Sequence, residues 1–306
     1  MPRTLVECVP NFSEGRDAAK VSEIVAAICS VPGVFVLDHE MDQDHNRSVV
    51  TFAGPSEVVG DAAIRGAGRA VELIDMNRHE GVHPRIGAAD VVPFVPVEGV
   101  SMTDCVHIAH RVARQLWRRY HLPSYLYGEA ALRPDRVRMA SVRRGGYEGL
   151  RDEVRVNPER TPDFGKPQLH PTAGAVAVGA RKFLIAYNIN LASSDIEIAR
   201  RIATLVRASS GGLPCVQAMG VMLESRNQAQ VSMNLTDFDR TPMHVVYEAV
   251  RREAALYGVE IAEMEIVGLI PLRALDGAPQ WFLDLTRIPP SLILENRLAE
   301  AVRALK

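Results

Sequence analysis

Apolar and polar residues follow two rhythms along the first half of the chain, and these predict strands and helices in turn. Period-two runs bounded by Gly, Pro or Asn are typical of strands, and spacings of three and four residues are typical of amphipathic helices. The predicted elements are strands over residues 4–10, 34–39, 48–54 and 91–97 and helices over residues 13–29 and 55–73. Their order is β-α-β-β-α-β.

The second half of the chain repeats this order. Its predicted elements are strands over residues 182–190, 216–223, 229–235 and 265–272 and helices from about Ser193 and over residues 241–258. In both halves the turn between the central strands holds adjacent Asn and Arg, at Asn46-Arg47 and at Arg226-Asn227. The repetition predicts an α+β fold of two ferredoxin-like (βαββαβ) subdomains in tandem, with antiparallel or mixed sheets that carry helices on one face.

Several segments of the first half have no counterpart in the second. They are the long connection at residues 75–90, a helix over residues 102–120 and a strand over residues 123–130. Residues 133–179 are rich in Gly, Pro and Arg, which is typical of a connector between lobes. We therefore expect one subdomain at residues 1–180, including this connector, and a second at residues 181–306. Long connections in compact domains are often functional, which draws attention to residues 75–90.

Composition excludes some classes of function. The chain has 306 residues and a formal net charge of −2, whereas nucleic-acid-binding domains are strongly basic. It contains no uninterrupted apolar run of the roughly 20 residues needed to cross a bilayer, and its first residues lack the apolar run of a signal peptide. We expect a cytoplasmic protein that binds neither nucleic acid nor membrane.

The long connection contains HEGVH, residues 79–83, which matches a zinc-protease pattern that works only on a helix. Gly81 weakens a helix there, and Pro84 disfavours helical conformation at His83. We therefore expect no metal site. Histidine is suited to proton transfer near neutral pH. His83 is therefore either a catalytic residue whose orientation is fixed by the adjacent Pro84, or a surface histidine with no functional role.

Two polar groups near strand ends are further candidates. Asn11, Ser13 and Glu14 are typical of a helix start, or they could help bind an anionic substrate at free helix amides. Asp38 and Glu40 lie at the end of a predicted strand, where either could orient a histidine. The chain lacks a G-x-G-x-x-G run after its first strand and a phosphate-binding loop, so we expect no nucleotide cofactor.

Five blocks of the sequence resemble the formiminotransferase family. They occur in this order along the chain: VECVPNFSEGRD, ELIDMNRHEGVHPRIGAADVVPFVPV, YLYGEA, TPDFGKP and GARKFLIAYNINL. The resemblance implies two ferredoxin-like subdomains with a folate tunnel between them, and a homodimer. It also implies transfer of a formimidoyl group from N-formimidoyl-L-glutamate to N5 of tetrahydrofolate, as in histidine degradation, with tetrahydrofolate as co-substrate and no metal.

The same resemblance implies roles for individual residues. His83 matches the catalytic histidine of the family, and Glu40 matches a second acid that is usually aspartate, so Asp38 stays a candidate beside it. Residues 164–172 match the folate-binding stretch. The expected substrate-binding and folate-binding residues are Asn11, Arg85, Tyr127, Phe164, Gly165, Lys166, Thr172, Gly174, Asn188 and Asn190.

Three other functions stay open from the sequence. The donor could carry a formyl group, as in N-formylglutamate or 5-formyltetrahydrofolate, because the sequence does not register one nitrogen replaced by oxygen. Paired lobes of this kind could also form a non-catalytic folate-binding module. A metallopeptidase would instead be inhibited by chelators. For the transferase, we expect a separate cyclodeaminase to act downstream.

Overall fold

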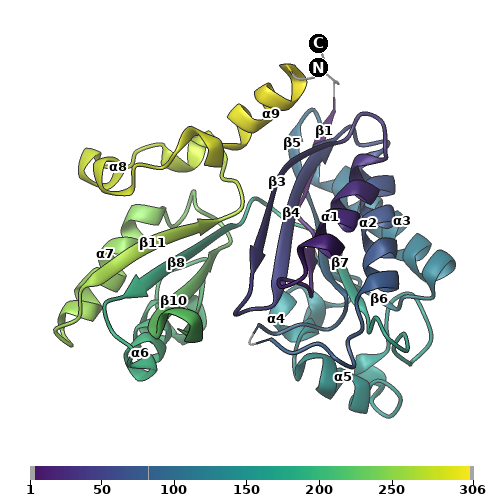
Figure 1. The fold of residues 1–306 in the computed structure, drawn as a ribbon, viewed down its shortest axis with the longest axis horizontal. Helices are drawn as coiled ribbons and strands as arrows, with labels where there is room; N and C mark the ends of the chain where they lie inside the picture. Colours follow the sequence, from purple (N-terminus) through teal and green to yellow (C-terminus); the bar gives the residue numbers. More distant parts are fainter. Residues whose placement is uncertain (1–3, 82, 304–306) are drawn as a thin grey trace. The chain divides into compact units, whose positions relative to one another are not determined.

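The computed structural model describes residues 4–81 and 83–303, and the chain divides between Arg181 and Lys182 into two compact units (Figure 1). Each unit has its own sheet. The first sheet is mixed and the second is antiparallel, so the prediction of an α+β fold with mixed and antiparallel sheets is confirmed. Among the described residues, none of the helices combines the length and the apolar character that crossing a membrane requires.

The first unit follows the predicted order and then adds further elements. They are β1 (Leu5–Cys8), β2 (Asn11–Phe12), α1 (Ala18–Cys29), β3 (Phe35–Asp42), β4 (Arg47–Gly54), α2 (Val59–Leu73), β5 (Ala89–Glu98), α3 (Met102–Tyr120), β6 (Ser124–Gly128), α4 (Met139–Val142), α5 (Gly146–Glu153) and β7 (Val176–Ala180). The sheet order is β1-β4-β2-β5-β7-β6, with β3 paired to β4. Strands β5, β7 and β6 are parallel, so β4, β5, β6 and β7 all begin at one edge of the sheet.

Helix α1 begins later than the sequence predicted. Its N-cap is Asp17, whose carboxylate accepts from the amides of Ala19 and Lys20. Such a cap contributes about 0.5–2 kcal/mol. Asn11 instead lies in β2, and Ser13 donates its hydroxyl to the Gly87 carbonyl, so the prediction that these two residues start the helix is wrong.

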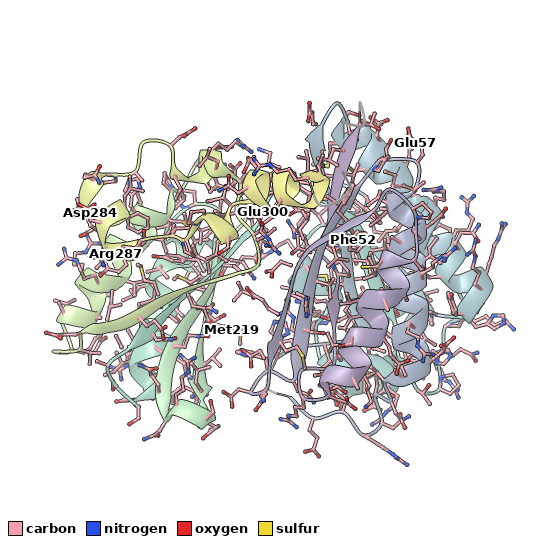
Figure 2. The ribbon with its side chains drawn as sticks, turned by 45° about the horizontal axis from the view of Figure 1, so that its top comes forward. Phe52, Glu57, Met219, Asp284, Arg287 and Glu300 are labelled. Carbon is pink, nitrogen blue, oxygen red and sulfur yellow. The ribbon has the colours of Figure 1, made fainter. Side chains whose placement is uncertain are left out.

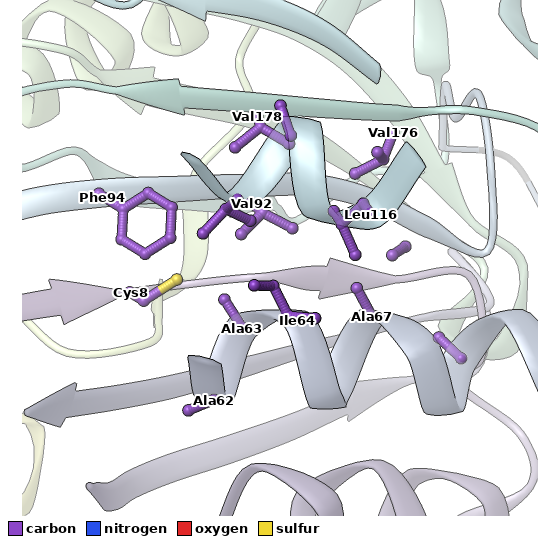
Figure 3. Close-up of a cluster of buried hydrophobic side chains, with 14 of the residues drawn as sticks. Cys8, Ala62, Ala63, Ile64, Ala67, Val92, Phe94, Leu116, Val176 and Val178 are labelled. Carbon is purple, nitrogen blue, oxygen red and sulfur yellow. The ribbon is translucent and has the colours of Figure 1, made fainter. Parts of the chain in front are cut away.

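The core of the first unit lies between the sheet and helices α1, α2 and α3. Phe52 of β4, labelled in Figure 2, has an exposed fraction of 0%, and Figure 3 shows small residues of α2 facing the strands. The helices approach closely because α2 is rich in Gly and Ala. A Cβ on Gly66 would lie 2.6 Å from the Ile28 side chain, and one on Gly68 would lie 2.2 Å from the Tyr120 ring. A larger side chain at Gly66 would force α1 away from α2, and one at Gly68 would force α3 away from it.

Residues 133–179 are not a connector between lobes. They contain α4, α5 and β7, and β7 inserts between β5 and β6 of the first sheet. Val142 and Leu150 pack against Tyr125 and Val91, on the sheet face that α1 to α3 leave uncovered. Helices therefore contact both faces of the first sheet, which corrects the expectation of helices on one face in this unit.

The second unit repeats the pattern in its simpler form. Its elements are β8 (Ile185–Leu191), α6 (Ile196–Val206), β9 (Val216–Leu223), β10 (Gln228–Leu235), α7 (Met243–Ala255), β11 (Ile261–Val267), α8 (Gln280–Thr286) and α9 (Leu294–Arg303). The sheet order is β11-β8-β10-β9, and α6 and α7 bury the apolar face of the strands. The last strand was predicted at residues 265–272. It lies at Ile261–Val267 and ends before Gly268, which has φ 78°; Ile270 then forms an isolated bridge with Ile293, and Leu272–Leu275 form a 3₁₀ helix.

Each of the two hairpin turns holds an asparagine in the left-handed conformation. Asn46, between β3 and β4, has φ 46°, and Asn227, between β9 and β10, has φ 46°. Asn tolerates this left-handed conformation better than most residues, which accounts for its presence in both turns. In the first unit the turn sets the register in which Arg47 faces Asp42.

Candidate active site

Two segments meet at the edge of the first sheet where β4 to β7 begin. The connection between α2 and β5 pairs with the segment before β7 through Ala88 N to Ala173 O at 2.9 Å and Ala175 N to Ile86 O at 3.0 Å. Met76 N also donates to Thr172 O at 2.7 Å. The predicted folate-binding stretch is therefore attached to the connection that carries His83.

The same connection packs against the β3–β4 turn. The Asn46 amide donates to Glu80 O at 2.8 Å and accepts from Gly15 N at 2.9 Å. A Cβ on Gly81 would lie 2.4 Å from His45 O, so only glycine lets the backbone approach the turn this closely. The same glycine that weakens a helix over HEGVH therefore allows the segment to pack closely against the hairpin turn.

His79 is held by hydrogen bonds at both ring nitrogens. Nε2 contacts Asn46 O at 2.9 Å, and Nδ1 accepts from Arg85 Nε at 3.1 Å. Arg85 also forms a two-pronged ion pair with Glu148, at 2.8 and 3.1 Å. A substrate carboxylate at Arg85 would therefore have to displace Glu148. Among the described residues, no three His, Cys, Asp or Glu side chains gather as a metal site would require.

His83 contacts an arginine rather than a carboxylate. Arg47 Nη1 lies 2.7 Å from His83 Nε2. A guanidinium can only donate, so Nε2 accepts and the ring proton is on Nδ1. Nδ1 is buried and has no hydrogen-bond partner in the part of the chain that the structure describes.

A second arginine lies near this pair. Arg143, in the turn between α4 and α5, contacts the carboxylate of Asp90 at the start of β5. The other oxygen of Asp90 accepts from Ile86 N at 2.8 Å. Asp90 therefore fixes both Arg143 and the backbone three residues after His83.

These surroundings disfavour a charged His83. Burial, together with the positive charges of Arg47 and Arg143, holds the pKa of His83 well below its usual value of about 6.5. The ring is therefore neutral at pH 7. Because the unfolded ring binds a proton near pH 6.5 and the folded ring does not, this site lowers the free energy of unfolding as pH falls below that value.

The protonation of His83 can be followed directly. In NMR titrations we expect its imidazole resonances to show no midpoint between about pH 6 and 8. In Arg47→Met a positive neighbour is lost, so the pKa of His83 should move up toward its usual value. A wild-type midpoint at or above about 6.5 would contradict the neutral ring.

The candidate acids lie on one face of β3. Glu40 is opposite Val49 of β4, and Val49 is opposite Asn11 of β2, so these three side chains share a sheet face. Asp38 and Arg47 point to the same face because strand residues alternate. Glu40 is two residue pairs from the Asp42–Arg47 pair along the hairpin, whereas Asp38 is four pairs from it. Glu40 is thus the nearer of the two predicted acids to the arginine that contacts His83.

Asp42 orients a histidine, but not the predicted one. Its carboxylate contacts His45 Nδ1 at 2.8 Å and accepts from His45 N at 2.8 Å. The His45 and His83 rings lie 5.9 Å apart between centroids. Burial opposes ionisation of Asp42, but its bonds to His45 outweigh this effect and lower the pKa of Asp42.

The remaining binding candidates of the first unit differ in burial: Asn11 and Tyr127 are buried, whereas Phe164 is half-buried. Asn11 donates to Val9 O at 2.9 Å, and Tyr127 packs in the cluster beneath α4 and α5. Phe164 pairs with Ser124 through two backbone hydrogen bonds, and Arg114 lies over its ring.

Two glycines of the predicted folate-binding set have positive φ, namely Gly165 at 127° and Gly174 at 71°. A Cβ on Gly174 would lie 3.0 Å from Gly87 Cα, so a larger residue would not fit here without a shift of the backbone. Lys166 is exposed, and Thr172 is half-buried beside His170.

Asn188 and Asn190 lie in the second unit, on the sheet face away from α6 and α7. Each donates to a glutamate of β11 at 3.3 Å, Asn188 to Glu265 and Asn190 to Glu263. Gln230 of β10 donates to Asn190 at 2.9 Å, and its own buried oxygen has no partner among the described residues. Met219, labelled in Figure 2, lies on the same face and is 42% exposed.

Sequence reasoning missed the residues around His83. Arg47 was noted only as part of the repeated Asn-Arg turn, and Arg143 fell in the segment interpreted as a connector. The adjacent Asn and Arg in both hairpins were the available signal for Arg47.

Fold and site together define a two-unit α+β protein with a neutral histidine bound to an arginine at a sheet edge. Residues 5–181 match the family described as "Formiminotransferase domain, N-terminal subdomain", and residues 186–303 match "Formiminotransferase domain". The chain belongs to the formiminotransferase family, which confirms the resemblance found in its sequence.

Curated relatives agree with this assignment. The chain is 47% identical to "Glutamate formimidoyltransferase" of Thermoplasma acidophilum, over 97% of this chain and 98% of that protein. It is 42% identical to the protein of the same name from Streptococcus pyogenes serotype M1, over 96% and 98%. It is also 46% identical to "Formimidoyltransferase-cyclodeaminase" of Rattus norvegicus, over 92% of this chain and 52% of that protein.

Proposed function

We propose that this chain is a glutamate formimidoyltransferase, which transfers the formimidoyl group of N-formimidoyl-L-glutamate to N5 of tetrahydrofolate. The observation that carries the proposal is a neutral His83 at a sheet edge, beside the stretch that resembles the family's folate-binding segment. Family membership over nearly the whole chain supports the choice of reaction.

The reaction moves one proton from one nitrogen to another. N5 attacks the formimidoyl carbon and loses its proton, and the bond from that carbon to the glutamate nitrogen then breaks as that nitrogen gains a proton. We assign both transfers to His83, because a neutral imidazole can accept the first proton and return it. The lone pair of Nε2 faces Arg47 Nη1, so Nη1 must move away from Nε2 before His83 can act as a base.

We further propose that Glu40 acts with His83, with Asp38 as the more distant alternative. The position of Glu40 on the same sheet face as Asn11 and Arg47 supports this choice. A carboxylate there would stabilise the protonated form of the formimidoyl group, which N5 attacks more readily than the neutral form.

The proposed binding residues fall into two sets. Around the pterin and its tail we propose Tyr127, Phe164, Gly165, Lys166, Thr172 and Gly174. For the polar ends of the substrates we propose Asn11, Arg85, Asn188 and Asn190. The polar face that Asn188 and Asn190 form with Glu263 and Glu265 supports hydrogen bonding to an amidine or a pterin.

We also propose that each unit is a ferredoxin-like subdomain, at residues 1–180 and 181–306. The β-α-β-β-α-β order and the matching Asn46 and Asn227 turns support a duplication. A cytoplasmic homodimer is the proposed state, with a cyclodeaminase acting on the product.

A side-by-side donor assay tests the proposed function. The protein is incubated with tetrahydrofolate and either N-formimidoyl-L-glutamate or N-formyl-L-glutamate, and the product is followed by its absorbance. We expect 5-formimidoyltetrahydrofolate from the first donor at the higher kcat/KM. Higher kcat/KM with the formyl donor would replace this function by formyl transfer, and tetrahydrofolate binding without turnover would leave a binding module.

A further inference from the structure

Three buried N–H groups around His83 have no hydrogen-bond partner in the described part of the chain. They are Nε of Arg47, Nε of Arg143 and Nδ1 of His83. Buried donors are almost always paired, because an unpaired one costs the free energy of its lost bond to water. Three such donors in one neighbourhood indicate a site that an acceptor completes.

The charged groups of the site indicate which kind of acceptor would pair with these donors. Arg143 is neutralised by Asp90, but the contact of Arg47 is with a neutral imidazole, and no carboxylate of the described residues lies within 4.0 Å of its guanidinium. Arg47 is partly exposed, so a ligand can reach it. Asp42 and Asp90 act on Arg47 only at longer range, and a planar fork of donors whose buried Nε has no partner among the described residues suits a carboxylate.

The position of Arg47 distinguishes between the carboxylates of the two substrates. In the formimidoyl donor, the α-carboxylate is attached to the carbon that bears the leaving nitrogen. In tetrahydrofolate, the glutamate carboxylates lie beyond the aminobenzoyl ring from N5. A guanidinium in contact with the proton-transferring histidine is therefore close to the donor's α-carboxylate and distant from the folate tail.

We propose that Arg47, assisted by Arg143, binds the α-carboxylate of the formimidoyl donor beside His83. This inference rests on the proposed function. The carboxylate draws Nη1 of Arg47 away from His83 Nε2 and frees the lone pair that accepts the N5 proton. It also cancels the positive charge that disfavours protonation of His83, so the ring becomes a better base once the donor is bound.

Two donor analogues test the assignment on the wild-type protein. One has the α-carboxylate of N-formimidoyl-L-glutamate replaced by a carboxamide, and the other has the γ-carboxylate replaced. We expect kcat/KM to fall by roughly 10- to 100-fold more with the α-carboxamide than with the γ-carboxamide, since a charge-assisted pair is lost. Equal losses for the two analogues would overturn the inference.

Substitution of Arg47 provides the second arm. In Arg47→Met the preference for the natural donor over the α-carboxamide should collapse to within a few-fold, and Arg47→Lys should restore part of it. The matched control is Arg78→Met. Arg78 lies in the connection that carries His83, and its side chain is 89% exposed. An unchanged preference in a folded Arg47→Met protein would leave Arg47 only a positioning role for His83 and overturn the inference.

A folate arm separates the two carboxylate sources. The ratio of kcat/KM for tetrahydrofolate and for tetrahydropteroate, which lacks the glutamate, should be the same in wild type and Arg47→Met. A collapse of that ratio, with donor preference intact, would assign Arg47 to the folate tail and contradict the inference. Absence of transfer from N-formimidoyl-L-glutamate in wild type would instead refute the proposed function, and the inference with it.

Discussion

His83→Ala is expected to lower kcat for formimidoyl transfer by about 10²- to 10⁴-fold, the usual contribution of a general acid–base group. The substitution removes the ring to which we assign the transfer of the proton from N5 to the glutamate nitrogen. It leaves the backbone bonds between the connection and the segment before β7 intact, so the dissociation constant of tetrahydrofolate should change little. Steady-state kinetics and fluorescence titration measure the two quantities.

His39→Ala is the matched control, because His39 is an exposed histidine on the opposite face of β3 from Glu40. Its activity should equal that of wild type. If His83→Ala stays within a few-fold of wild type, or if folate binding is lost together with turnover, His83 has no place in proton transfer.

Asp90→Ala is expected to cost up to about 3–5 kcal/mol in the free energy of unfolding, because it removes the partner of Arg143, whose side chain is only 16% exposed. Asp90 is 2% exposed, and it holds both Arg143 and the amide of Ile86. An unpaired Arg143 would also add positive charge beside Arg47 and His83, so kcat/KM should fall as well. Urea denaturation and steady-state kinetics test the two effects.

Two further variants serve as comparisons for Asp90→Ala. Asp90→Asn keeps an oxygen for the Ile86 amide and should be less destabilising than alanine. Glu197→Ala removes an exposed partner of Arg200 and should change the free energy of unfolding by no more than about 1 kcal/mol. If Asp90→Ala is as mild as Glu197→Ala, the buried pair does not hold the site together.

Much of the fold follows from local pattern. The helix predicted at residues 102–120 coincides with α3, because Ser101 and Asp104 form a capping box and an apolar stripe runs along the helix. Strand β7 was missed because its partners, β5 and β6, lie far from it in the sequence and it follows a Gly- and Pro-rich segment. Parallel strands depend on such distant pairings, which local periodicity does not reveal.

The candidate site was predictable only in part. His83 stood out through Pro84 and its long connection, and the family resemblance gave it a role. Its contact with Arg47 depends on the register of the β3–β4 hairpin and on the close approach of Gly81 to the turn. Neither can be read from the spacing of residues so far apart in the chain, and Arg143 is farther still.

The central claim is that His83 moves protons while a formimidoyl carbon passes from glutamate to N5. The most direct test uses N-formimidoyl-L-glutamate labelled with ¹³C at that carbon, followed by NMR with tetrahydrofolate and either wild type or His83→Ala. We predict that the label moves to N5 with release of one glutamate per transfer in wild type, and that its movement is slowed by about 10²-fold or more in the variant. A label that stays on glutamate with wild type, or moves equally fast with both proteins, would contradict the account.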